Sequence, residues 1–373
     1  MTVGLGTVLK EWGRIGCIGF GGPPAHIALL RKLCVDDRKW ITSQEFEDAI
    51  AACNLLPGPA STQLAIFCAW RVRGRAGALV GGAAFIVPGL IVILALAALF
   101  LEGDPPVAVT AAGAGAGAAV AAVALHAGWS LMPPGWRRAP EHSSRVRWSI
   151  YLVLGAVAAA TVGPWLVLLL IACGVAEVVA QGLPASSRQS RPLVAVGLSG
   201  GVLLSVAWVA LKVGALSYGG GFVIIPLMQA DAVDHYHWMT AAQFLNAVAL
   251  GQVTPGPVVH TVAVVGYAAA GLAGGLLAAV VAFSPSFAFI LLGAHRFDRL
   301  RADRRVRAFL DGAGPAAIGA ILGSAVPLVR ALEEPWQYPI LAGALILVFV
   351  FRRGPVLTLL AAAAAGIVIV ALT

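Results

Sequence analysis

The stretch Asn54-Leu55-Leu56-Pro57-Gly58-Pro59-Ala60-Ser61-Thr62-Gln63 decides the fold, together with a second Pro-Gly-Pro at Pro255-Gly256-Pro257. Proline cannot donate a backbone hydrogen bond and disfavours helix in the residue before it, while glycine permits unusual dihedral angles. Each triplet lies inside a long segment, Ser43 to Trp70 and Ala241 to Ala269. We therefore expect each segment to be a helix that is broken at its centre.

The two triplets belong to a longer internal repeat at a constant offset of 198 residues. Between Arg14 and Gln63, 15 of 50 positions are identical to their counterparts without a gap. This similarity indicates a duplication. It predicts an N-terminal repeat (1–181), a linker (182–192) and a C-terminal repeat (193–373). The alignment places Arg14 over Lys212, Gly21-Gly22 over Gly219-Gly220, Trp40 over Trp238 and Phe46 over Phe244.

The composition places the chain in a membrane, because 60% of its residues are hydrophobic, 11% are charged and the mean hydropathy is +0.89. Several nearly uncharged runs approach the roughly 20 residues that span a bilayer. No ten-residue alternation suggests a barrel, so these runs are expected to be helices. The prediction is an all-α, polytopic, multi-pass protein of the cell (inner) membrane. The stretch Met132 to Arg147 is expected to be a surface loop.

Charged loops predict opposite orientations for the two repeats, because Lys and Arg are retained on the cytoplasmic side. Arg31, Lys32, Arg38 and Lys39 make one loop basic, whereas the equivalent stretch from Gln229 to His237 contains no Lys or Arg. Two further pairs of loops show the same contrast. The same placement in short loops explains the net charge of +8 without a nucleic-acid partner.

Both loops that flank Ser43 to Trp70 are basic, so this segment should enter the membrane and return as a re-entrant hairpin. A mirrored hairpin is expected at Ala241 to Ala269. Broken helices at membrane depth are tolerated only where protein or a wet cavity covers the backbone, so the two tips should meet around a polar site. Helix N-termini at the tips would attract anions. The polar residues beside the tips are Asn54, Ser61, Thr62, Gln63, Gln252, Thr254, His260 and Thr261.

Two equivalent cations, Arg14 and Lys212, each precede a Gly-Gly pair by seven residues. A charge within a membrane helix is costly, so each should have a partner or a ligand. An oxyanion would suit both, with N–H groups of the glycines nearby. The alternative for Arg14 is to extend to the membrane interface.

Other residues give weaker signals. His260 lies at the second tip, where it would sense protonation or serve as a packing residue. The acidic residues nearest to apolar segments are Glu47, Asp48, Glu177 and Asp311, and any of them could carry a coupling proton. The five cysteines form no close pair, and no metal-ligand spacing or nucleotide-binding motif is present, so no cofactor or metal is expected.

The motifs Phe20-Gly21-Gly22-Pro23, Leu56-Pro57-Gly58-Pro59, Ser217-Tyr218-Gly219-Gly220 and Val253-Thr254-Pro255-Gly256-Pro257 resemble the chromate transporter (CHR) family in its long-chain, two-domain form. The resemblance implies efflux of chromate and chromate resistance, with sulfate as an analogue that shares the path. It also implies that Arg14, Lys212 and the tips are functional. His260, and Ala60-Ser61-Thr62 after the first tip, depart from the family pattern.

The function expected from the sequence is secondary transport of chromate by alternating access at a site between the tips. Transport of sulfate or another small oxyanion is the alternative. A membrane enzyme acting on a lipid phosphate is a further alternative, but no catalytic set is present, so the chain is not expected to be an enzyme. The partners are then the oxyanion and membrane lipid. A homodimer is compatible with such a bundle, although nothing in the sequence specifies an interface. The substrate-binding candidates are Arg14, Gly21, Gly22, Asn54, Pro57, Gly58, Pro59, Ser61, Thr62, Lys212, Gly219, Gly220, Gln252, Thr254, Pro255, Gly256, Pro257 and His260.

Overall fold

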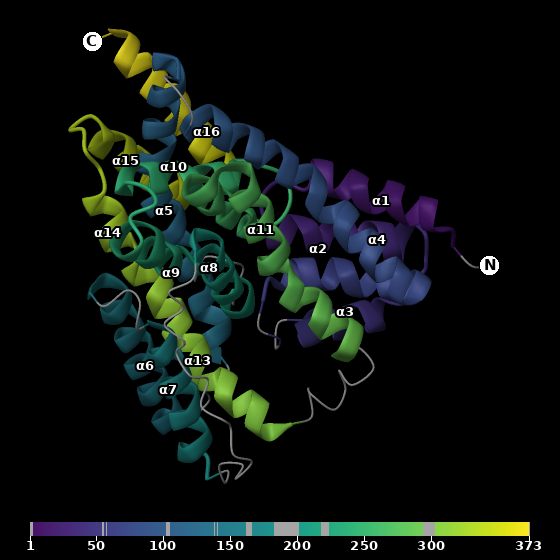
Figure 1. Cartoon of the computed structure of the whole chain (residues 1–373). Coiled ribbons are helices and arrows are strands. Elements are labelled where there is room, and N and C mark those ends of the chain that lie inside the picture. Colours follow the sequence, from purple (N-terminus) through teal and green to yellow (C-terminus); the bar gives the residue numbers. More distant parts are fainter. Residues whose placement is uncertain are drawn as a thin grey trace.

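The computed structural model describes residues 3–53, 56, 58–101, 105–137, 139, 141–161, 166–182, 201–217, 224–293 and 303–372. All regular structure in these ranges is helical, which confirms the all-α prediction (Figure 1). The first half contains α1 (Leu5–Ile18), α2 (Pro23–Arg31), η1 (Lys32–Asp37), α3 (Ser43–Cys53), α4 (Ala60–Leu101), α5 (Val107–Arg137), α6 (His142–Thr161) and α7 (Leu166–Ala180). The second contains α8 (Val202–Leu216), α9 (Ile224–Gln229), η3 (Ala230–His235), α10 (Ala241–Val253), η4 (Val258–His260), α11 (Thr261–Gly293), α13 (Arg304–Gly323), α14 (Ala325–Arg330), α15 (Gln337–Leu345), η6 (Ile346–Val350) and α16 (Pro355–Leu372).

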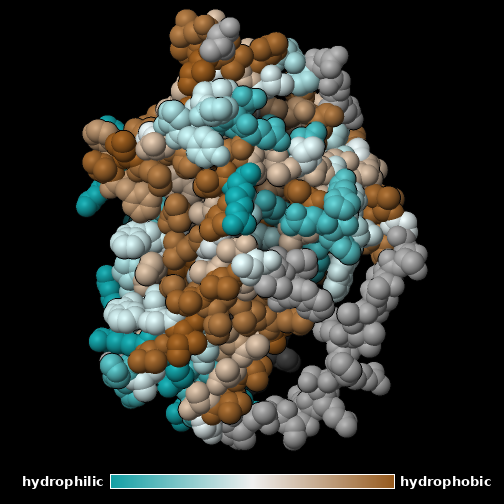
Figure 2. All heavy atoms as spheres, turned by 90° about the vertical axis from the view of Figure 1, so that its left-hand side faces the viewer, coloured by the Kyte–Doolittle hydropathy of each residue, from teal (hydrophilic) through white to brown (hydrophobic). Residues whose placement is uncertain are grey.

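Five helical stretches in the described ranges are long and apolar enough to cross a membrane. They are Ala60–Leu101, Val107–Arg137, Val258–Gly293, Arg304–Arg330 and Pro355–Leu372. Figure 2 shows one face of the molecule, where hydrophobic side chains reach the surface over a wide area. Exposed large apolar residues include Val153 and Val157 of α6 and Leu168 and Ile171 of α7. Such a surface suits lipid rather than water, and the protein is a multi-pass membrane protein.

Both predicted helix breaks are present. The helix α3 ends at Cys53 and α4 begins at Ala60, while α10 ends at Val253 before the short turn η4. Gly58 and Gly256 adopt positive φ angles of 115° and 90°, a region that favours glycine. The helices on either side of each break contact each other, α3 with α4 and α10 with α11. Each Pro-Gly-Pro segment therefore forms the tip of a helical hairpin; Pro57 itself lies outside the described residues.

The hairpins also begin alike and end alike. The Thr42 hydroxyl caps α3 by accepting from the Glu45 backbone N–H, and Thr240 forms a reciprocal capping box with Gln243 at α10. Beyond each tip the helix breaks again, with positive φ at Gly74 (62°) and Gly271 (58°). These glycines, and the in-helix prolines Pro88 and Pro285 that follow, match at an offset of 197 rather than 198. The second half is thus one residue shorter between its tip and its second break.

The largest core cluster of the described residues includes residues of both halves, and smaller clusters lie between α6, α7 and α13. The helix α1 packs on α4, α8 packs on α11, and α4 and α11 contact each other. Contacts also cross the expected boundary elsewhere, since α13 packs against α6 and α7 and α16 packs against α5 (Figure 1). Most of the expected linker 182–192 lies outside the described residues.

The expected loop from Met132 to Arg147 is wrong. Helix α5 continues to Arg137 through Pro133 and Pro134, and α6 already begins at His142. Tertiary packing stabilises this last stretch of α5, because a methyl group added at Gly135 would lie 3.2 Å from the Trp148 indole nitrogen. The prolines therefore do not end the helix.

Candidate functional site

The tip of the second hairpin, Pro255 to Pro257 (tip 2), is bonded to the first half of the chain. The backbone N–H of Gly256 donates to the carbonyl oxygen of Gly19 at 2.9 Å, directly after the end of α1. A methyl group added at Gly89 of α4 would lie 2.1 Å from the Pro255 carbonyl oxygen. Only a glycine at position 89 lets this tip approach α4 so closely.

His26 connects the same carbonyl to the helix after the first tip. Its Nε2 lies 2.9 Å from the Gly19 carbonyl oxygen and its Nδ1 lies 3.2 Å from the Ser61 hydroxyl. Because a carbonyl only accepts, the proton is on Nε2, and in the neutral ring Nδ1 accepts from Ser61. His26 is fully buried and packs edge-on against Phe85. Gly256, Gly19, His26 and Ser61 thus form a continuous chain of hydrogen bonds from tip 2 to the start of α4.

The tip of the first hairpin, described at Gly58 and Pro59 (tip 1), contacts the second half. A methyl group added at Gly58 would lie 3.3 Å from the Gly214 carbonyl oxygen of α8 and 3.4 Å from the Ser286 hydroxyl of α11. Tip 1 therefore docks on α8 and α11, and tip 2 docks on α1 and α4. We call this arrangement the crossed docking of the tips.

Several buried polar side chains around the two tips have no hydrogen-bond partner within the described part of the chain. Buried polar groups are nearly always paired, so a group of unpaired ones at one place requires an explanation. None of these side chains is acidic, and most can donate a hydrogen bond. The unpaired atoms are Thr62 Oγ1, Ser217 Oγ, Gln252 Nε2, Ser286 Oγ and both ring nitrogens of His260.

Helix α4 begins at tip 1, so its N-terminal end lies beside this polar region. The N–H groups of Thr62 and Gln63 bond back to the Pro59 carbonyl oxygen, and the first turn begins at Ala60. A helix N-terminus carries a partial positive charge. Together with the unpaired side chains it forms an environment that favours an anion.

The predicted cations occupy different positions. Lys212 donates to both carboxylate oxygens of Asp231, at 2.6 and 2.8 Å, and lies over the Trp208 ring. Arg14 is exposed and lines a cavity of about 310 Å³, whose other charged residues are Glu11, Lys32, Asp37 and Arg38. No described residue that lines this cavity belongs to a tip. Asp231 is thus the partner of Lys212, whereas Arg14 lies away from the tips.

The remaining candidates fall into three groups. Gly21 and Gly22 have positive φ, and a methyl group on Gly22 would lie 3.8 Å from the Val258 side chain, close behind tip 2. The Thr254 hydroxyl donates to the Leu250 carbonyl oxygen within its own helix. Four candidates lie outside the described residues: Asn54, Pro57, Gly219 and Gly220.

The sequence reasoning missed Ser217 and Ser286, and it gave His26 no role. Ser217 occupies the position equivalent to Gly19, and the two residues share a conformation, with φ/ψ of −68°/79° and −77°/68°. Ser286 corresponds to Gly89 only at the offset of 197. An alignment of the two halves that allows a gap of one residue after the tips pairs Ser286 with Gly89 and so could have indicated it.

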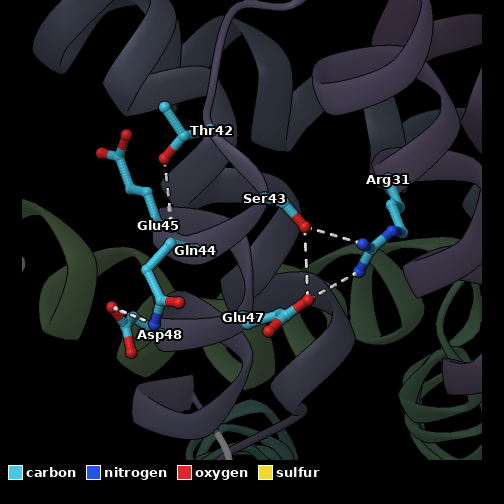
Figure 3. Close-up of polar contacts among 7 residues, drawn as sticks. All are labelled: Arg31, Thr42, Ser43, Gln44, Glu45, Glu47 and Asp48. Atoms are coloured by element: carbon cyan, nitrogen blue, oxygen red, sulfur yellow. Dashed lines mark hydrogen bonds and ion pairs between the residues drawn. The ribbon is translucent and has the colours of Figure 1, made fainter.

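The outer end of the first hairpin is held by charged side chains (Figure 3). Arg31 of α2 donates to the Ser43 hydroxyl at 2.7 Å and to Glu47 at 3.3 Å. Arg71 of α4 pairs with Glu45 of α3. These contacts join α2, α3 and α4 at the end opposite to tip 1, so the start of α3 is anchored to its neighbours.

Comparison with known proteins identifies the family of the chain. The family model described as "Chromate transporter" matches residues 6–178 and 204–367. A chromate transport protein of Cupriavidus metallidurans is 31% identical over 334 residues, covering 85% of this chain and 80% of the relative. A chromate transport protein of Pseudomonas aeruginosa is 30% identical over 343 residues, with 86% and 80% covered. A probable chromate transport protein of Synechococcus elongatus is 27% identical over 329 residues, with 85% and 82% covered. No solved structure matches the chain. With both halves matched by one model, the chain belongs to the chromate transporter family.

Proposed function

We propose that this protein is a secondary transporter that exports chromate and binds it between the two hairpin tips. The unpaired polar atoms carry the proposal, because they are buried beside the tips or beside the helices on which the tips dock. Thr62 follows tip 1, Gln252 precedes tip 2, Ser286 faces Gly58, and Ser217 follows α8. An oxyanion with four oxygens can accept from several such donors at once. The names of the relatives specify chromate; sulfate has the same shape and charge, and shares or competes for the site.

The crossed docking supports alternating access. Each tip contacts two helices of the other half, so a rocking motion of one half against the other would change both tip contacts together. Breaks at Gly74 and Gly271 separate each hairpin from the membrane-spanning helix that follows, and no side chain crowds either glycine. We propose that the halves have opposite orientations, as the loop charges predict, so that the two tips approach the site from opposite sides of the membrane.

The test is uptake of radiolabelled chromate and sulfate into proteoliposomes that contain the purified protein, with Ser286→Ala as the variant. The Ser286 hydroxyl has no partner among the described residues, so its removal should leave the melting temperature unchanged or raise it. Loss of a hydrogen bond to a charged ligand should weaken apparent affinity about 10- to 100-fold. Ser284→Ala is the matched control, because this exposed hydroxyl on the same helix donates to its own helix carbonyl, that of Val281.

Saturable uptake that Ser286→Ala weakens and Ser284→Ala preserves would support a site at the tips. Equal effects of the two variants would place the substrate elsewhere. Absence of uptake under every imposed gradient would reject the transporter and favour the lipid-phosphate enzyme.

A further inference from the structure

His260 occupies an unusual position within the polar region at the tips. It is fully buried, and its ring lies between tip 2 and α4. A methyl group added at Gly256 would lie 3.0 Å from His260 Cε1, and one added at Gly89 would lie 2.9 Å from the same atom. Phe283 of α11 packs edge-on against the ring at 5.3 Å between centroids. Two glycines and an aromatic ring thus form a cradle that fits an imidazole.

Neither ring nitrogen of His260 makes a hydrogen bond of good geometry within the described residues, although the Ile86 carbonyl of α4 faces the ring. The one titratable group that interacts with it electrostatically there is His26 of α2. The described neighbours of the ring are Gly256 on tip 2, Gly89 and the Ile86 carbonyl on α4, and Phe283 on α11. Among the described residues, no carboxylate is shown against this imidazole to balance a charge on it.

The acidic side chains that could compete for the role of proton carrier are already engaged. Glu47 accepts from Arg31, and Asp48 accepts from Gln44 at the outer end of the hairpin (Figure 3). Glu177 accepts two hydrogen bonds from Arg147, one from Tyr151 and one from Gln181. Asp311 also has a partner. His26 has both nitrogens bonded, so a second proton on its Nδ1 would require the Ser61 hydroxyl to turn from donor to acceptor.

We propose that His260 carries one proton together with each transported oxyanion. This inference rests on the proposed site between the tips. An imidazolium without a counter-charge is unfavourable in a buried site, and so is an oxyanion that meets only neutral donors. The charge on the bound anion offsets the cost of burying the imidazolium, and the imidazolium offsets the cost of burying the anion. By thermodynamic linkage, protonation of His260 and binding of the anion increase each other's affinity by the same factor.

The proton comes from water on the side where the anion enters and returns to water where the anion leaves. The free ring nitrogen of the neutral imidazole accepts it, and both N–H groups then donate, one to the Ile86 carbonyl and one to the oxyanion. No bond of the anion changes. A dianion that moves with one proton transfers one net negative charge per cycle instead of two.

The test measures anion and proton movement in the same proteoliposomes, with the membrane potential clamped by potassium and valinomycin. Radiolabelled sulfate reports the anion, and a pH indicator trapped in weakly buffered vesicles reports the proton. We expect about one proton per sulfate in the wild-type protein. An imposed pH difference of one unit should shift the final sulfate gradient about tenfold. In His260→Asn the ratio should fall to near zero, whatever flux remains.

His26→Asn is the matched control, because it replaces the other buried tip histidine, whose nitrogens are both bonded. It should change the flux but keep the proton-to-sulfate ratio. A second readout needs no transport: wild-type protein in weakly buffered detergent should take up about one proton per bound sulfate, and His260→Asn none.

The outcomes separate this inference from the proposed function. Sulfate or chromate flux without proton movement in the wild type would overturn the inference and leave the transporter standing. An unchanged ratio in His260→Asn would also overturn it. Absence of any anion flux or binding in the wild type would instead remove the proposed function on which the inference depends.

Discussion

The ion pair of Lys212 and Asp231 marks a difference between the two similar halves, since it neutralises a largely buried cation that the first half lacks at the equivalent position. Lys212 is largely buried, and Asp231 holds it with both carboxylate oxygens. The residue equivalent to Asp231 is Leu33, and the residue equivalent to Lys212, Arg14, is exposed. Arg14 therefore needs no buried carboxylate.

Removal of one member of this pair should destabilise the protein strongly. We expect Asp231→Leu to lower the free energy of unfolding by about 3–5 kcal/mol, because it leaves a buried ammonium unpaired. The double variant Lys212→Met with Asp231→Leu should recover most of that loss. Thermal unfolding in detergent measures both. The exposed pair Arg31–Glu47 is the control, and its loss should cost about 0–1 kcal/mol. A double variant no more stable than Asp231→Leu would contradict this account.

Gly89 is the residue on which the docking of tip 2 depends. An added methyl group would meet the Pro255 carbonyl oxygen at 2.1 Å, so Gly89→Ala must displace the tip. We expect transport to fall at least about tenfold, since small misplacements at a binding site are costly. Gly343→Ala in α15 is the control, because nothing lies within 4 Å of its added methyl group. That variant should keep full transport and gain about 0.5–1 kcal/mol of helix stability. Normal transport by Gly89→Ala would show that tip 2 does not need this contact.

At the level of elements, the second break in each hairpin helix depends on a single glycine. Gly74 and Gly271 have positive φ and no neighbour within 4 Å of an added methyl group, so substitution changes backbone strain and little else. Gly271→Ala should cost about 1–2 kcal/mol of stability, measured by thermal unfolding. Gly74→Ala should show the same cost. A clear difference between the two would mean that the breaks are not equivalent.

The helix breaks were predictable from the sequence because proline and glycine act on their own backbone. A Pro-Gly-Pro triplet removes two backbone donors around a flexible glycine, whereas the prolines Pro88, Pro133, Pro134 and Pro285, which lack this glycine between them, lie inside helices. Contacts between distant elements were not predictable in this way. Nothing near His26 in the chain indicates that it bonds to Ser61, and the equivalent residue is Ile224. Lys212 was expected to have a partner or a ligand, but the sequence could not indicate that Asp231, on a different helix, lies close enough to pair with it.

For the whole molecule, the opposite orientation of the halves remains a prediction that accessibility can check. Asp36 and Asp234 are equivalent, exposed and identical in charge. In a background with the exposed Cys17 changed to Ser, we expect Asp36→Cys to react with a membrane-impermeant thiol reagent from the cytoplasmic side only. Asp234→Cys should react from the outer side only, because its loop lacks basic residues. Labelling of both from one side would mean that the halves are parallel.

The hydrogen bond from Gly256 to Gly19 also constrains how the protein is made. The ribosome delivers Gly19 to the membrane long before it delivers the second hairpin. Until then the surface of α1 and α4 that receives tip 2 is uncovered, and the Gly19 carbonyl oxygen has His26 alone as its partner among the described residues. A nascent chain that stops before residue 256 therefore leaves this surface of the first half without the tip that packs on it. Complete synthesis is a precondition for either half to reach its mature packing.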